Sequence, residues 1–143
     1  MKDIKENATI TLVNNQSGGG ETDRIEFVSG GNFYRKDGAF FVTYKEHSEM
    51  GMGNSRVLLK VEDRNITMRR MGEFQSVMKY ELGKTTEFIY RMPYGEMNIK
   101  LKTEMIDNNL SQEGGSVDFS YILIMDSSEI HNDVRLDIRV EGN

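Results

Sequence analysis

The feature that most constrains the fold of this chain is the strict alternation of apolar and polar residues along most of its length. Met97, Ile99 and Leu101 alternate with polar neighbours, and residues 134–140 repeat the same pattern. A period of two places every apolar side chain of a strand on one face. No stretch shows the 3.6-residue period of an amphipathic helix. The sequence therefore predicts an all-β protein whose strands are buried on one face and exposed to solvent on the other.

Turn residues divide the alternating pattern into about ten strands. The pair Asp37-Gly38 is typical of a tight hairpin, and Gly83 and the pair Gly114-Gly115 mark further turns. The run Ser17-Gly18-Gly19-Gly20 is interpreted as a flexible loop without regular structure. The predicted strands span residues 4–13, 23–34, 39–47, 55–63, 65–71, 73–82, 84–92, 95–110, 116–126 and 132–141.

The only proline in the chain, Pro93, lies between two predicted strands in Met92-Pro93-Tyr94-Gly95. Proline presets φ for the second position of a type I turn, and glycine can adopt the left-handed conformation of a following bulge. The sequence therefore predicts a three-residue hairpin loop. The alternative interpretation makes Tyr94 a lid at the mouth of a barrel.

The alternation changes phase within the predicted strand 95–110. Thr103 continues the row of apolar residues, but the pair Met105-Ile106 breaks it, and Leu110 is in phase with Ile106. An extra residue in one strand of an antiparallel pair produces such a shift. We expect a β-bulge near Glu104–Met105 that turns Ile106 and Leu110 inward.

A meander of ten strands with no covering helix would leave two long exposed edges unless it closed. Short connections favour a closed antiparallel up-and-down β-barrel over a Greek-key sandwich, which needs longer crossovers. With 143 residues and no internal linker, the chain is expected to form one domain over residues 1–143.

Composition limits the partners and the compartment. The net charge of −5 argues against nucleic acid, whose backbone favours a basic surface. No apolar run is long enough to span a bilayer, so no membrane partner is expected. The chain has no cysteine and no apolar leader sequence, which favours a cytoplasmic location.

Two charged residues extend apolar rows and are the most informative in the chain. Glu46 continues the row of Tyr44, and Arg70 continues the row of Met68. A charge on an inward face must be paired or hydrated. Three interpretations stay open: both reach water at the barrel rim, both form a structural ion pair, or Arg70 binds the anionic head group of a ligand through its guanidinium fork. We predict that the two side chains lie within salt-bridge distance on the inward side.

The interior of the predicted barrel is the candidate ligand site. A small barrel can be packed solid or can hold one modest ligand, and the ten methionines supply adaptable side chains. We expect a cavity on the order of 300 Å3 or more. The candidate ligand-binding residues are Tyr44, Glu46, Met68, Arg70, Phe74, Met78, Tyr90, Met97 and Tyr121.

Several segments resemble a known family. They include Tyr44-Lys45-Glu46, Leu58-Leu59-Lys60-Val61-Glu62, Arg70-Met71-Gly72-Glu73-Phe74, Pro93-Tyr94-Gly95 and Gly114-Gly115. The chain resembles the YwiB-like family of uncharacterised bacterial proteins, over almost its whole length. The resemblance implies a calycin-like, lipocalin-related β-barrel, but it implies no activity or ligand. The chain lacks the tryptophan of the lipocalin signature, so ligand binding by analogy is a weak inference.

No enzyme motif appears in the sequence, and we expect no catalytic residues, no metal and no cofactor. The two histidines, His47 and His131, are far apart in the sequence, and we expect them at strand ends or in loops. Two function classes remain. The first is a protein that binds a small apolar or anionic ligand inside the barrel. The second is a non-enzymatic interaction or structural module with a filled barrel, acting through its outer surface or as a homodimer. Its outward apolar residues would be Val77, Ile89, Ile122 and Ile124.

Overall fold

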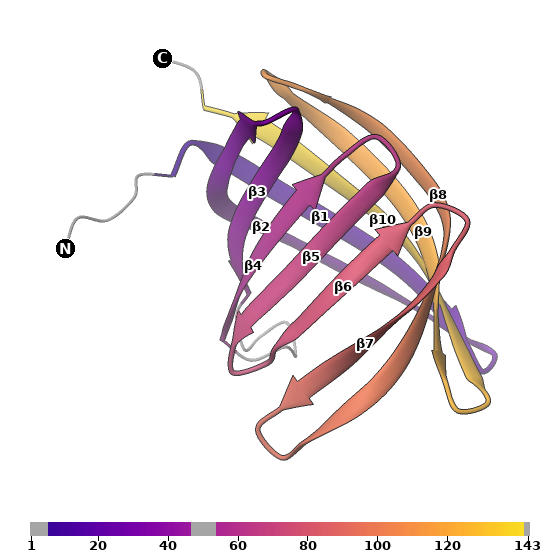
Figure 1. Cartoon of the computed structure of the whole chain (residues 1–143). Helices are drawn as coiled ribbons and strands as arrows, with labels where there is room; N and C mark the ends of the chain where they lie inside the picture. The colour runs from indigo at the N-terminus through magenta and orange to yellow at the C-terminus, as the bar shows by residue number, and fades with distance from the viewer. Residues whose placement is uncertain (1–5, 47–53, 142–143) are drawn as a thin grey trace.

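The structure, a computed structural model, describes residues 6–46 and 54–141 (Figure 1). Ten β-strands account for most of these residues, as the alternating sequence predicts. No helix among the described residues is long and apolar enough to cross a membrane. The strands are β1 (Ala8–Gly18), β2 (Glu21–Lys36), β3 (Ala39–Glu46), β4 (Ser55–Val61), β5 (Asn65–Gly72), β6 (Ser76–Glu81), β7 (Thr85–Met92), β8 (Gly95–Ser111), β9 (Gly114–Met125) and β10 (Ser128–Val140).

The strands form one antiparallel sheet in the order β6-β5-β4-β3-β2-β1-β10-β9-β8-β7. Sequential strands are neighbours, and β1 also pairs with β10, with Ala8 opposite Val140 and Ser17 opposite His131. The sheet curls so that its two edge strands, β6 and β7, approach each other (Figure 1). The predicted up-and-down barrel is confirmed.

The barrel has an incomplete seam between β6 and β7. The backbones of Gln75 and Arg91 exchange two hydrogen bonds of 2.9 and 2.8 Å, and the Thr86 hydroxyl donates to the Lys79 carbonyl at 2.7 Å. The Gln75–Arg91 bridge is the one backbone pair assigned across this seam in the described ranges. This bridge and the Thr86–Lys79 contact join β6 to β7 without a continuous ladder. The barrel is therefore nearly closed.

Several strand boundaries differ from the predicted ones, and the turn residues explain where. Asp37 and Gly38 have φ of 52° and 80°, which confirms the predicted two-residue hairpin. The run 17–20, predicted as a flexible loop, instead continues the β1–β2 ladder and turns at Gly19 and Gly20, whose φ values are 60° and 82°. Two glycines supply the two positive φ angles that a tight hairpin needs. Strand β10 starts at residue 128 rather than 132, and β6 at residue 76 rather than 73.

The proline loop is a corner, as predicted, but it is shorter than predicted. Met92 pairs directly with Gly95, so Pro93 and Tyr94 form a two-residue loop. Gly95 has φ of 153° and does not adopt the left-handed helical conformation. Tyr94 is 82% exposed, so it covers no barrel mouth.

The predicted β-bulge in β8 is confirmed. Thr103 pairs with Tyr121 and Met105 pairs with Ser120, which leaves Glu104 as the extra residue. Thr103 is buried, Glu104 and Met105 are exposed, and Ile106 returns to the inner face. The bulge keeps Ile106 and Leu110 of this 17-residue strand on the same side of the sheet as Thr103, whereas Met105 faces outward.

The barrel is packed solid at the end that carries the start of β1, the end of β10 and the β2–β3 hairpin (Figure 1). Val42, Leu59 and Val61 are 0–1% exposed there, and Leu136 and Ile138 pack from β10. The inward residues nearer the opposite end are larger, more polar and less completely packed. The candidate site lies among them.

Candidate functional site

A partly open cavity of about 350 Å3 lies inside the barrel. The cavity predicted from the sequence is therefore present, and its size is at the small end of the range for ligand pockets. Its walls are mostly apolar and come from the inward rows of both halves of the sheet. The apolar lining includes Leu12, Phe27, Met68, Met78, Phe88 and Leu123.

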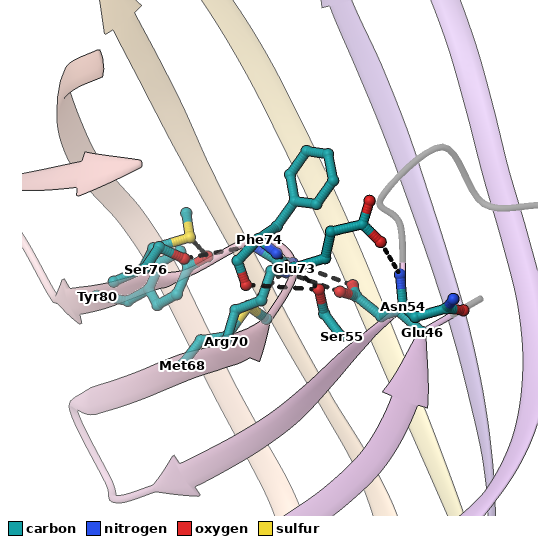
Figure 2. Close-up of polar contacts among 10 residues, drawn as sticks. Glu46, Asn54, Ser55, Met68, Arg70, Glu73, Phe74, Ser76 and Tyr80 are labelled. Atoms are coloured by element: carbon teal, nitrogen blue, oxygen red, sulfur yellow. Dashed lines mark hydrogen bonds and ion pairs between the residues drawn. The ribbon is translucent and has the colours of Figure 1, made fainter. Parts of the chain in front are cut away.

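The Glu46–Arg70 ion pair, whose hydrogen bonds are drawn in Figure 2, belongs to the residues that line the cavity. Glu46 ends β3 and Arg70 lies on β5, and both continue the inward rows of their strands. Arg70 donates from Nε to Glu46 Oε1 at 2.7 Å and from Nη2 to Oε2 at 3.1 Å. The two residues are 6% and 8% exposed. The predicted inward salt bridge is confirmed, and the interpretation that both charges reach water at the rim is wrong.

The guanidinium of Arg70 is occupied on all three nitrogens. Besides the two bonds to Glu46, Nη1 donates to the Ser76 hydroxyl at 3.4 Å and Nη2 contacts the Met68 sulfur at 3.8 Å. Burial by itself lowers the pKa of Arg70, but the hydrogen bond and charge of Glu46 outweigh it and hold this pKa above its ordinary value. The pair is therefore an internally neutralised unit rather than a vacant anion site.

Tyrosine hydroxyls supply further polar groups around the cavity. Burial raises the pKa of Tyr44, and the nearby charge of Glu46 adds to this shift. Burial likewise raises the pKa of Tyr80 and Tyr121, whose rings pack edge to face with centroids 4.8 Å apart. Burial also raises the pKa of Tyr90. A phenol is neutral at physiological pH even with its ordinary pKa, and the raised pKa values keep these hydroxyls protonated further into the alkaline range, so they add no charge to the cavity.

Three amide side chains form a second polar group in the cavity wall, and sequence reasoning missed them. Asn14 and Gln16 lie on β1, and Asn132 faces them from β10. Asn132 Oδ1 accepts from Asn14 Nδ2 at 3.2 Å and from Gln16 Nε2 at 2.9 Å, and its Nδ2 donates to the Ile130 carbonyl at 3.1 Å. A signal was present, because Asn14 continues the inward row of Ile10. The predicted strand ends at residue 13, one residue before Asn14, so the prediction leaves Asn14 outside the inward row.

Comparison with known proteins places the chain in a family. Residues 10–138 match the family described as a domain of unknown function, DUF1934. The chain belongs to this family. The DUF1934 chain is 26% identical over 112 residues to the "Uncharacterized beta-barrel protein YwiB" of Bacillus subtilis (strain 168), a match that covers 78% of each protein.

A solved structure shows the same fold. The crystal structure of the ywiB protein from Bacillus subtilis superposes with a TM-score of 0.82 and 22% identity, covering 96% of this chain and 93% of that one. At this identity, the likeness shows the fold alone. The predicted YwiB-like resemblance is confirmed, whereas neither comparison names calycins, so the calycin likeness stays a prediction.

Eight of the nine residues predicted from the sequence line the cavity of the DUF1934 barrel. Phe74 is the exception: it lies in the β5–β6 turn, packs its ring against Tyr90 at 5.8 Å, and exchanges hydrogen bonds with Ser55 (Figure 2). The prediction failed because β6 starts two residues after Phe74. The eight lining residues are Tyr44, Glu46, Met68, Arg70, Met78, Tyr90, Met97 and Tyr121.

Other candidate residues of the DUF1934 chain lie elsewhere. His47 is outside the described residues, and His131 lies within β10, not at a strand end, with its Nε2 3.9 Å from Glu129. In the described ranges, no group of three acidic, histidine or cysteine side chains is placed to hold a metal. Ile122 faces outward but is only 7% exposed, so it is not available for the predicted outer contact, whereas Ile89 is 41% exposed.

Proposed function

We propose that this protein binds a small, uncharged and largely apolar molecule inside its barrel. The cavity is the observation that carries the proposal. One end of the barrel is packed with aliphatic side chains that are almost completely buried, but the remaining inward rows leave about 350 Å3 unfilled. Protein interiors are usually packed without voids of this size, and a ligand-sized apolar cavity is the usual form of a binding site.

The charges in the cavity support an uncharged ligand. Among the described residues that line it, Glu46 is the only carboxylate and Arg70 the only guanidinium, and they neutralise each other in a bidentate pair. An anionic ligand would have to compete with Glu46 for Arg70 and would leave a buried carboxylate without its partner. The anion-binding role considered for Arg70 is therefore disfavoured.

The side chains of the cavity wall can adapt to more than one apolar molecule. Four methionines, at positions 68, 78, 97 and 125, line the cavity. Methionine has three rotatable bonds and a polarisable sulfur, so such a wall adapts to ligands of different outline. The proposed role is binding without catalysis, in the cytoplasm, by a small-molecule carrier or sensor.

Native mass spectrometry of freshly purified protein tests this proposal. We expect a mass excess that survives native conditions and disappears on denaturation. The same spectra report the oligomeric state. The variant Leu12→Trp should fill the cavity from β1 and abolish the excess, whereas Val13→Trp, on the outer face of the same strand, should retain it. A wild-type protein that carries no adduct and takes up no neutral apolar probe would overturn the proposal.

A further inference from the structure

We infer that the molecule held in the barrel carries a hydroxyl or amide N–H group that donates a hydrogen bond to Asn14 Oδ1. This inference rests on the proposed ligand-binding function and specifies the chemical class of the ligand. Asn14 lines the cavity, is 9% exposed, and its Oδ1 has no hydrogen-bond donor among the described residues. A buried acceptor without a donor is costly and is uncommon in native proteins.

The neighbours of Asn14 decide which atom of its amide is the oxygen and which is the nitrogen. Asn132 donates to the Ile130 carbonyl, so its Nδ2 must point there and its Oδ1 must point toward β1. An oxygen at that position requires donors, and Asn14 and Gln16 both present their amide nitrogens to it. Exchanging the Asn14 oxygen and nitrogen would place two oxygens together. Asn14 Oδ1 is therefore the atom left without a partner.

A donor from the cavity is the natural partner for this oxygen. Thr103 Oγ1 is the other buried oxygen without a partner in the part of the chain that the structure describes, but Thr103 does not line the cavity. Asn14 Oδ1 is buried against the protein, so a donor on a molecule in the cavity reaches it only when the Asn14 side chain turns toward the cavity. Asn132 Oδ1 keeps its bond from Gln16 when this happens, and the apolar walls hold the rest of the molecule. The ligand class is therefore a neutral amphiphile: an alcohol or a primary or secondary amide with a compact apolar chain.

Two isomeric probes isolate the proposed hydrogen bond. n-Octanol and heptyl methyl ether have the same atoms, but only the alcohol can donate. Two-dimensional amide NMR spectra of the intact chain would give both dissociation constants and would show whether the Asn14 side-chain amide shifts. We expect the alcohol to bind at least about tenfold more tightly than the ether. Octanoate should bind more weakly than the alcohol, because its carboxylate would be buried without a free cation.

The variant Asn14→Leu should remove the preference for the alcohol, so that the two isomers bind with similar dissociation constants. Asn132 Oδ1 would keep its bond from Gln16 at 2.9 Å, so the neighbouring network loses only one donor. Asn15→Leu, on the exposed face of β1, is the matched control and should behave as wild type. The comparison of the two isomers on wild-type protein stands even if Asn14→Leu does not fold.

Each outcome separates this inference from the function on which it rests. Equal binding of both isomers, or an unchanged preference in Asn14→Leu, would overturn the inference while leaving a ligand-binding barrel in place. Tightest binding of octanoate would overturn the neutral class. Failure of every probe to enter the barrel would overturn the proposed function as well.

Discussion

Arg70 on β5 and Glu46 at the end of β3 form a bidentate ion pair across β4, the strand that separates them. Both side chains continue apolar rows, and both are more than nine-tenths buried. Neither charge could be tolerated at its position without the other, because desolvation of a single ion is not compensated by the apolar wall. The pair is the main electrostatic constraint on the barrel interior, and its removal gives the first prediction.

Removing one partner should be much worse than removing both. Arg70→Met or Glu46→Gln alone should lower the free energy of unfolding by roughly 3–5 kcal/mol, because the remaining group is left buried without its partner. The double variant Glu46→Leu/Arg70→Met should lose much less. Urea denaturation of the three variants measures this difference. As a control, Arg24→Met breaks an exposed pair with Glu26 and should cost about 0–1 kcal/mol. Equal losses in single and double variants would contradict the prediction.

The same double variant tests what the pair contributes to binding. If the ligand is uncharged, Glu46→Leu/Arg70→Met should fold and retain whatever molecule the wild type carries. If Arg70 binds an anionic head group instead, the double variant should fold and purify empty. Native mass spectrometry of the double variant and wild type, purified in parallel, distinguishes the two results.

Alkaline pH should destabilise the barrel through its buried tyrosines. Tyr44, Tyr80 and Tyr121 have raised pKa values in the folded state, so above about pH 10 the unfolded chain loses protons that the folded chain retains. Stability contributed by these groups is complete below that pH and declines as the pH rises further. Each tyrosine should contribute about 1.4 kcal/mol per pH unit to the decline.

Denaturation curves at successive alkaline pH values measure this slope. Tyr44→Phe, which removes one of the three hydroxyls, should reduce the slope by about a third. Tyrosinate absorbance should rise together with unfolding for the buried groups. A slope that is the same in wild type and Tyr44→Phe would show that Tyr44 is not protected from ionisation.

Deleting the bulge residue should be tolerated, although deletions within strands usually are not. Without Glu104, Thr103 would be followed by an outward Met105 and an inward Ile106, in the register they already have with β9. Deleting Lys100 from the regular part of β8 would instead turn Ile99 and the earlier residues of β8 to the opposite face of the sheet. We expect the first deletion to give a folded protein and the second to prevent folding, as judged by circular dichroism and NMR dispersion.

Gly31 should resist replacement because two strands meet at it. It is the residue of β2 that pairs with both Ala8 on β1 and Tyr44 on β3. A Cβ atom there would overlap the Thr43 carbonyl oxygen and the Ile10 side chain. Gly31→Ala should therefore destabilise by about 1–3 kcal/mol. Gly38→Asn in the β2–β3 turn, where nothing lies near the added atom, should cost less, and thermal unfolding compares the two.

The sequence by itself determined which face of each strand turns inward. Period-two alternation is a local property of the backbone, so it predicted the rows that carry Tyr44, Glu46, Met68 and Arg70, and even the phase shift at Glu104. Antiparallel pairing and barrel closure followed from short connections and unpaired edges. Local rules failed where a boundary was misjudged by a few residues, as for Phe74 and Asn14. There the turn chemistry, rather than the alternation, decides where a strand begins or ends.

Only the tertiary structure decided which inward residues meet and how much space they leave. Arg70 reaches Glu46 across β4, and Asn14 reaches Asn132 from β10, 118 positions away in the chain. These distances depend on the stagger between strands and on the tilt that closes the barrel, which no single strand encodes. The cavity and the seam between β6 and β7 also depend on the whole sheet. All ten strands together set the circumference of the barrel, and this circumference decides how closely β6 approaches β7 and how much of the interior the side chains fill.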